Sequence, residues 1–353
     1  MQNPFTTTFS KVPDNSYIST DQLDGILSNF TYDDPSESVY KITGVRGSGK
    51  TVLLAKIVDE MKKGEFEDKG WLVCMLSPAR DMLQQFAAFL RNVKLSKGKK
   101  NSKSINLSAN LMGAGGGIGV SSSEEGRLFD IGIEIGEMLS RATKEGKKIF
   151  IGVDDVSKNR EMIVFASEFG KWLIERYPVY MVCTGLYENI EQLSNVKNLT
   201  FFRRATTVMT KPLNFIKMSE MYRNRLGINT AEAIVLAEMT KGYAYAFQEL
   251  GVLFFNHKYT KPEQAERELR AELYAYAYEK IWEELSDGDR EIVRIIADRE
   301  EYKREEVIGK MSKPQNYSVY RDRLTRRGIT QVRQGFIGLA LPYFGDYVRE
   351  YHR

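Results

Sequence analysis

The sequence predicts an α/β fold: a parallel sheet with helices on both faces, followed by a helical lid and a C-terminal winged-helix domain. Two observations predict the sheet. Several apolar runs are typical of strands, and each run is followed by a segment whose apolar residues have helical spacing. A third observation is the change of pattern after residue 285, where short amphipathic helices precede a hairpin. We expect domains over residues 1–212, 213–284 and 285–353.

Composition excludes some classes of protein but does not select one. The chain has 353 residues, with 51 Lys and Arg against 47 Asp and Glu, so its overall charge does not call for a nucleic-acid partner. No apolar run approaches the roughly 18 residues that suggest a membrane span. The first residues also lack the pattern of a signal peptide. We expect a cytoplasmic protein with no membrane partner.

The first predicted strand, residues 38–43, leads into Gly44-Val45-Arg46-Gly47-Ser48-Gly49-Lys50-Thr51, which fits the phosphate-loop pattern G-x-x-x-x-G-K-[ST]. A helical pattern begins at Val52, and we expect Val52 to bind the nucleotide together with the loop. Glycines let backbone N–H groups turn inward around an anion, and the helix N-terminus adds its dipole. We expect Lys50 to reach the β- and γ-phosphates of a nucleotide and Thr51 to bind Mg²⁺. The alternative is a glycine turn that binds nothing.

The segment before this loop is polar and rich in turns. A short amphipathic helix begins near residue 20 and is capped by Thr20 or Asp21. Such a lead-in would lie over the ligand-binding face of the sheet, which makes Pro13 and Tyr17 candidates for contact with a base. Packing of these residues on the protein surface is the alternative.

The second predicted strand, residues 70–76, is followed by a helix from Pro78 to about Val93. Residues 94–103 carry many lysines, and we interpret them as a solvated connector, with phosphate contact as the alternative. Alternating residues around a glycine cluster predict a β-hairpin over residues 105–121. No Gly-Lys-Ser/Thr follows these glycines, so a flexible or partner-contacting hairpin is favoured over a second phosphate loop.

A long helix over residues 124–143 leads into an apolar strand that ends in Asp154 and Asp155. An apolar run ending in aspartate is common, but here it follows a phosphate loop. After a phosphate loop, we expect Asp154 to bind the coordination shell of Mg²⁺ and Asp155 to polarise the attacking water. Together the two motifs predict the sheet of a P-loop NTPase.

The remaining strands of the sheet are expected over residues 179–185 and 206–210, with helices over residues 161–177 and 186–195. Thr184 stands at the carboxyl end of its strand, where ligand-binding residues of parallel sheets lie. Its hydroxyl is expected to sense the γ-phosphate or to position water. A cap for the following helix is the alternative role.

The last two domains are predicted from helical patterns. Four helices form the lid, over residues 214–226, 230–240, 243–257 and 262–284. Such a lid beside a nucleotide is a plausible moving part.

The winged-helix prediction has three helices and a hairpin, from a cap at Ser286 to residue 341. Between Lys303 and Arg333 there are nine basic and three acidic residues, a local charge of +6. This charge favours contact with the phosphates of double-stranded DNA. The predicted DNA-contacting residues are Arg321, Arg323, Arg326 and Arg327. The alternative is a winged helix that packs against its own ATPase domain or against a protein partner.

With these motifs in place, the chain resembles the AAA+-related prokaryotic ATPases, a group that includes archaeal-type, signal-transduction and origin-recognition-like ATPases. The resemblance covers nearly the whole chain, although only the phosphate-loop and Mg²⁺ motifs are specific. The residues that carry it are Asn3 to Thr6, Gly44 to Thr51, Ile151 to Asp155, Thr184-Gly185, Phe202 to Thr206, Thr240 to Tyr245 with Gln248, and Leu341 to Phe344.

The resemblance implies ATP as ligand, a helical lid and switching between nucleotide states. It also implies that Arg203 or Arg204 acts as an arginine finger in a neighbouring subunit, or braces its own domain. Two departures stand out. Asp154-Asp155 replaces the usual Asp-Glu, which predicts slow hydrolysis, and Ile18 to Asp21 replaces a Gly-Arg-Glu/Asp box, which leaves the adenine contacts open.

The function expected from the resemblance is an ATP-binding, Mg²⁺-dependent and hydrolysing switch coupled to a DNA-binding winged helix. The alternative is a signalling or defence ATPase whose winged helix binds protein, with very slow hydrolysis. Self-association is a further expectation.

Overall fold

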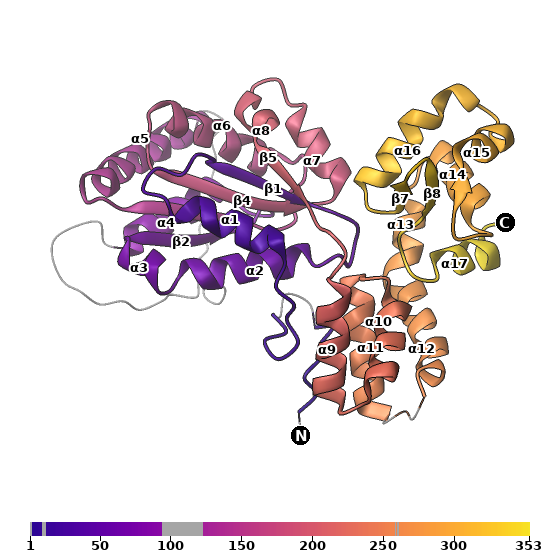
Figure 1. The fold of residues 1–353 in the computed structure, drawn as a ribbon. Helices are drawn as coiled ribbons and strands as arrows, with labels where there is room; N and C mark the ends of the chain where they lie inside the picture. Colours follow the sequence, from indigo (N-terminus) through magenta and orange to yellow (C-terminus); the bar gives the residue numbers. More distant parts are fainter. Residues whose placement is uncertain (1, 9–11, 94–122, 258, 260) are drawn as a thin grey trace.

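The computed structural model describes residues 2–8, 12–93, 123–257, 259 and 261–353 (Figure 1). The predicted connector over residues 94–103 and the predicted hairpin over residues 105–121 lie outside the described residues. None of the helices in the described ranges is long and apolar enough to cross a membrane.

The first part of the chain forms one parallel sheet with the strand order β2-β3-β4-β1-β5. The strands are β1 (Val39–Thr43), β2 (Trp71–Leu76), β3 (Lys148–Val153), β4 (Val179–Gly185) and β5 (Thr206–Met209). All four neighbouring pairs are parallel, as predicted. Their carboxyl ends therefore share one edge, and the segments that follow β1, β3, β4 and β5 meet there.

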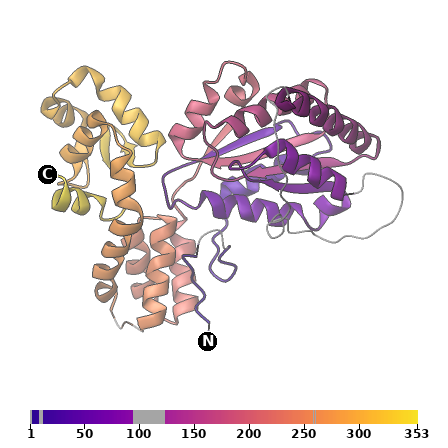
Figure 2. The ribbon, with the colours of Figure 1, turned by 180° about the vertical axis from the view of Figure 1, so that it is seen from behind.

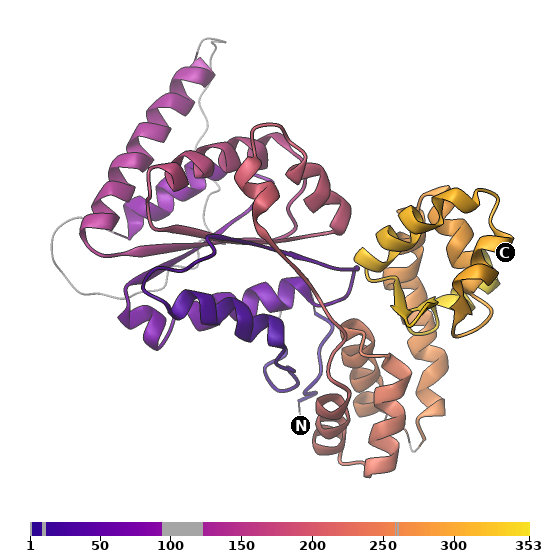
Figure 3. The same ribbon diagram turned by 45° about the horizontal axis from the view of Figure 1, so that its top comes forward.

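Helices cover both faces of this sheet (Figure 3). One face carries α1 (Asp21–Thr31) and α2 (Lys50–Met61), whose core includes Phe30 packed against Tyr40, Trp71 and other rings. The other face carries α4 (Met82–Asn92), α5 (Ser123–Lys144) and α6 (Arg160–Ile174). The short helices are α3 (Glu65–Asp68), α7 (Tyr187–Ser194) and α8 (Thr200–Arg204). The predicted fold class is confirmed.

Capping residues explain where these helices begin. Thr20 caps α1 by accepting a hydrogen bond from the Leu23 N–H, as predicted. The helix predicted from Pro78 begins at Met82 instead, because the Asp81 side chain accepts the Gln84 N–H.

The lid consists of α9 (Phe215–Leu226), α10 (Thr230–Thr240), α11 (Ala244–His257), α12 (Glu263–Leu273) and α13 (Glu279–Glu283). A π-helical turn over Tyr274–Tyr278 interrupts the last predicted helix. The start of the chain packs here rather than on the sheet domain to which we assigned it, because Phe5 is buried between Tyr222 and Phe247. Figure 2 shows the N-terminus beside the lid.

The winged helix is present, with two elements that the sequence analysis missed. Its helices are α14 (Asp287–Ile296), α15 (Arg304–Lys310) and α16 (Tyr317–Arg326), and its strands are β6 (Tyr302–Lys303), β7 (Thr330–Arg333) and β8 (Phe336–Leu339). The missed elements are β6, which adds a third strand to the hairpin, and the final helix α17 (Phe344–Tyr351). The lid and the winged helix share one hydrophobic core, in which Tyr278 contacts Phe344 and Tyr347.

Candidate functional site

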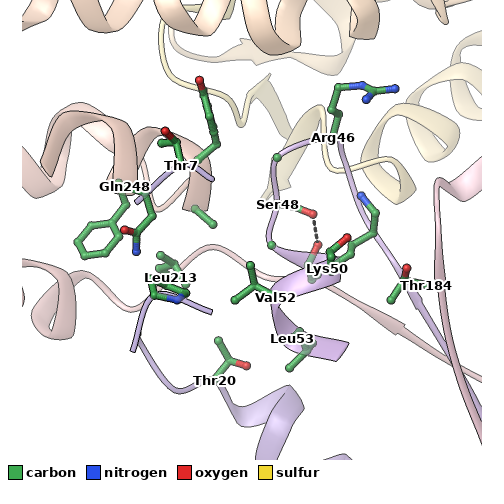
Figure 4. Close-up of a pocket in the computed structure, with 18 of the residues that line it drawn as sticks. Thr7, Thr20, Arg46, Ser48, Lys50, Val52, Leu53, Thr184, Leu213 and Gln248 are labelled. Atoms are coloured by element: carbon green, nitrogen blue, oxygen red, sulfur yellow. Dashed lines mark hydrogen bonds between the residues drawn. The ribbon is translucent and has the colours of Figure 1, made fainter. Parts of the chain in front are cut away.

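A cavity of about 410 Å³ lies where the carboxyl edge of the sheet, the start of the chain and the lid meet (Figure 4). The phosphate loop contributes residues 46–52, and Asp154, Asp155 and Thr184 lie on the sheet side. Pro13, Tyr17 and Leu213 also line the cavity. The cavity therefore brings together most of the predicted site residues, from four separate segments of the chain.

The phosphate loop has the backbone conformation that its glycines predict. Gly47 and Gly49 adopt left-handed φ angles of +76° and +90°, which side chains larger than glycine disfavour. The helix α2 begins directly after Gly49 without a side-chain cap, so its first N–H groups remain available to an anion. A Cβ atom on Gly44 would lie 1.9 Å from the Thr210 hydroxyl.

The Lys50 side chain lies inside the phosphate loop. Its ammonium group donates hydrogen bonds to the carbonyl oxygens of Gly44 and Val45, at 3.0 and 2.9 Å. Gly44 and Val45 are absent from the lining of the cavity, and they contact Lys50 through their carbonyl groups. Burial lowers the pKa of Lys50 to about 8, although the nearby Asp155 opposes that shift.

Thr51, Asp154 and Thr184 form one hydrogen-bonded cluster at the floor of the cavity. The Thr51 hydroxyl lies 3.0 Å from both carboxylate oxygens of Asp154. The Thr184 hydroxyl donates to Asp154 Oδ1 at 2.5 Å and accepts the Asp155 N–H at 3.0 Å. Thr184 does not cap the next helix, because Leu186 occupies the cap position of α7.

The oxygen atoms of this cluster fit Mg²⁺, a hard cation that binds few protein ligands and keeps waters and phosphate oxygens. Thr51 and Asp154 would hold the ion. Within the described ranges, no group of three or more His, Cys, Asp or Glu side chains forms a metal cage. Thr51 and Asp154 supply two ligands, so waters or phosphate oxygens would complete the shell of a cation held here.

Asp155 is the exposed member of the carboxylate pair. It follows the buried strand β3 by two residues and adopts a left-handed φ of +54°, which aspartate tolerates better than most side chains. Its N–H bond to Thr184 fixes the backbone while the side chain borders the cavity. This placement suits a group that contacts water rather than the metal.

The side of the cavity expected to take a base is built from the start of the chain and the lid. Pro13 and Tyr17 both line the cavity, and their contact with a base stays a prediction. Burial raises the pKa of Tyr17 to about 12, and the ammonium of Lys56 lies 5.6 Å from the centre of its ring. Tyr17 is therefore held in place as a neutral, partly apolar wall.

The structure does not bring Arg203 and Arg204 to this site. Both are exposed at the end of α8, directly before β5 begins. They therefore lie at the amino end of β5, whereas the cavity lies at the carboxyl ends of the strands. Within one chain they cannot contact the nucleotide phosphates, and a role toward a neighbouring subunit stays a prediction.

The four winged-helix arginines face different surroundings. Arg321 pairs with Asp322 on its own helix, and Arg323 pairs with Asp289 of α14. Arg326 donates to the Tyr187 hydroxyl of the sheet domain. Arg327 is only 5% exposed, and its guanidinium lies 2.7 Å from Glu188 and 3.6 Å from Glu284. Arg326 and Arg327 thus contact the sheet domain, in agreement with the packing alternative.

Sequence reasoning missed several residues that shape the site. The Thr210 hydroxyl, after β5, donates to the Ser48 hydroxyl at 2.8 Å. Tyr245 and Gln248 of the lid helix α11 line the cavity, and the adjacent Tyr243 contacts the phosphate loop. Thr210 carried a signal, because a polar residue at the end of a parallel strand lies at the ligand edge. The lid residues carried none beyond the family resemblance.

Taken together, the sheet order, phosphate loop, lid and winged helix give this chain the fold of the AAA+-related, origin-recognition-like P-loop ATPases. The Walker-type ATPase PABY2304 of Pyrococcus abyssi superposes with a TM-score of 0.60 at 13% identity, covering 95% of this chain and 97% of that one. The ORC2 protein of Aeropyrum pernix, in its ADPNP and ADP complexes, gives 0.52 at 11% identity, with 93% and 90% covered. No family model and no curated protein sequence matches. At this identity the likeness concerns the fold.

Proposed function

We propose that this protein is a Mg²⁺-dependent ATPase that acts as a molecular switch. The observation that supports this most strongly is the convergence of Lys50, Thr51, Asp154 and Thr184 on one cavity from three separate strands' ends. Phosphoryl transfer to water requires a lysine that binds the phosphates, a hydroxyl and a carboxylate that hold the cation, and a second carboxylate that contacts the water. The test is a calorimetric titration with ATP, in the presence and in the absence of Mg²⁺.

Each chain residue has a separate task in this reaction. When bound, Mg²⁺ would neutralise the phosphate oxygens. Lys50 and the N–H groups at the start of α2 bind the phosphate chain and orient it. Thr184 holds Asp154 and the backbone of Asp155 in a fixed relation, at 2.5 and 3.0 Å. Asp155 accepts a proton from the attacking water and orients it.

The switch depends on contacts between the phosphate loop and the winged helix. Arg46, the third residue of the loop, lies 3.5 Å from Glu284 at the end of the lid, and Glu284 also faces Arg327. In Figure 4 the Arg46 side chain points away from Val52 and Thr20. Arg327 in turn faces Glu188, which follows the strand that carries Thr184. A change in the loop on nucleotide binding would therefore reach the winged helix through charged groups.

Arg327→Ala is expected to release the winged helix from the sheet domain. The variant leaves Glu188 without its cation, while Glu284 keeps Arg46. The partly buried pair of Arg327 and Glu188 contributes on the order of 1–3 kcal/mol to docking after allowance for solvent screening. Burial raises the pKa of Glu188, and Arg327 opposes that shift. Glu188 Oε1 accepts no hydrogen bond within the described ranges, so this contact depends on charge. Small-angle X-ray scattering should show a larger radius of gyration.

Two further variants complete this experiment. Arg321→Ala removes an arginine whose ion pair with Asp322 and contact with the Tyr317 ring lie within its own helix, and it should leave the radius unchanged. Adding Glu188→Gln to Arg327→Ala removes the unpaired charge and should restore part of the docking. An Arg327→Ala protein as compact as the wild type would show that these ion pairs do not hold the domains together.

A second candidate function keeps the winged helix as a DNA reader, supported by its local charge and by the exposed position of Arg326. Under this proposal, Arg321→Glu with Arg326→Glu lowers affinity for double-stranded DNA at least tenfold. The slope of log affinity against log salt should fall by about two, because each phosphate contact contributes about 0.9. The measurement is fluorescence anisotropy at several salt concentrations.

A matched control has the same charge change in the lid, Arg223→Glu with Arg225→Glu, since both arginines are exposed on α9. It should leave DNA affinity within about twofold. A wild-type protein without salt-sensitive DNA binding would favour a winged helix that serves only protein contacts, as the packing of Arg327 supports.

A further inference from the structure

The carbonyl groups of the phosphate loop are satisfied from two directions. Lys50 donates to the first two, on Gly44 and Val45. The lid serves the next two, because the Tyr243 hydroxyl donates to the Arg46 carbonyl at 2.5 Å and the Tyr245 N–H donates to the Gly47 carbonyl at 3.0 Å. When Lys50 moves to a phosphate, the Val45 carbonyl keeps the Ser48 N–H at 3.2 Å, and the Arg46 and Gly47 carbonyls keep their contacts with the lid.

Tyr243 is built into this contact. The residue is 5% exposed, directly before α11, and its burial raises the pKa of its hydroxyl, which keeps the group protonated as a donor. A Cβ atom on Gly47 would lie 2.1 Å from the Tyr243 oxygen. The glycine at this position of the loop is therefore needed for the tyrosine as well as for the left-handed backbone.

The direction of one carbonyl decides where the next N–H points. In a trans peptide the C=O and N–H bonds point in opposite directions, and the described chain contains no cis peptide bond. The carbonyl of Arg46 points at the buried Tyr243, so the Gly47 N–H of the same peptide points to the opposite side. Gly47 lines the cavity, whereas Tyr243 does not.

We propose that Tyr243 is a positioning residue for phosphate binding: its hydroxyl holds the Arg46–Gly47 peptide so that the Gly47 N–H faces the β-phosphate. This inference rests on the proposed nucleotide-binding function and adds a residue from the lid to it. Because the positioning group belongs to the lid, lid docking strengthens phosphate binding. By thermodynamic reciprocity, a bound phosphate chain then stabilises the docked lid.

The test compares Tyr243→Phe with the wild type by calorimetric titration of ADP and of AMP. The variant keeps the ring and loses one hydrogen bond, so ADP affinity should fall about fivefold to tenfold. AMP lacks the β-phosphate, and its affinity should stay within about twofold. The separation of ADP from AMP is a readout that general damage to the lid would not produce.

Tyr222→Phe is the matched control, since Tyr222 is also a buried lid tyrosine and donates to a backbone carbonyl, that of Phe247, at 2.7 Å. It should leave both affinities within about twofold, with a similar change in melting temperature. Unchanged ADP affinity in Tyr243→Phe, or equal losses for ADP and AMP, would overturn the inference. A wild-type protein that binds no ADP would instead overturn the proposed function, and this inference with it.

Discussion

Lys50→Ala is expected to lower the affinity for ATP about a hundredfold or more. The ammonium group is held inside the phosphate loop by two backbone carbonyls, which places it within reach of a phosphate chain bound there. Lys50 is expected to donate to the β- and γ-phosphates, and the variant loses both of these hydrogen bonds. Hydrogen bonds to charged groups contribute about 1.5–3 kcal/mol each. Each 1.4 kcal/mol corresponds to about tenfold in affinity. Calorimetric titration of ATP in the presence of Mg²⁺ measures the change.

The pH dependence of ATP binding separates Lys50 from other sources of affinity. Burial lowers its pKa to about 8 in the nucleotide-free protein, and the phosphates bind its charged form. Affinity should therefore be full well below pH 8 and fall as the pH rises through 8, with proton uptake on binding. Lys63→Ala, which removes an exposed lysine just after α2, should keep this profile. An Lys50→Ala protein that binds ATP like the wild type would rule out the proposed site.

The sequence was sufficient for the part of the site that depends on local pattern. The phosphate loop is a contiguous motif between a strand and a helix, and Asp154 follows a strand whose apolar character is visible in the sequence. Parallel strands place their carboxyl ends at one edge, so strand prediction indicates that Thr51, Asp154 and Thr184 lie at the same edge of the sheet. The hydrogen bonds between them depend on the neighbouring positions of β3, β4 and β1, which the sequence does not predict.

Contacts between domains could not be predicted in this way. The sequence predicts Arg327 as a DNA contact because helix α16 is basic, but charge in a sequence does not show which side of a helix is covered. Its ion pair with Glu188 joins residues from two domains and leaves no periodic signal. Tyr243 was missed for the same reason, since its acceptor, the Arg46 carbonyl, is a backbone atom far away in the sequence.

Asp155→Asn is expected to reduce ATP turnover about a hundredfold or more while ATP affinity stays within about twofold. General base catalysis contributes about 10²–10⁴ to a rate, and asparagine does not accept the proton. Asparagine tolerates the left-handed φ of +54° at this position, so the loop after β3 should keep its shape. Lys50, Thr51 and Asp154 are untouched, which preserves binding. Single-turnover hydrolysis with protein in excess is the measurement, because the short Asp155 side chain predicts a slow wild-type rate.

Asp154→Asn distinguishes the two neighbouring carboxylates. Asp154 lies 3.0 Å from the Thr51 hydroxyl and is the expected Mg²⁺ ligand, so its replacement should weaken the Mg²⁺-dependent part of ATP binding. Asp155→Asn should leave that part intact and change the rate alone. Equal turnover in Asp155→Asn and the wild type would show that Asp155 is not the base. The attacking water would then have to be oriented by another group at the cavity, and Thr184 is already engaged with Asp154 and the Asp155 backbone.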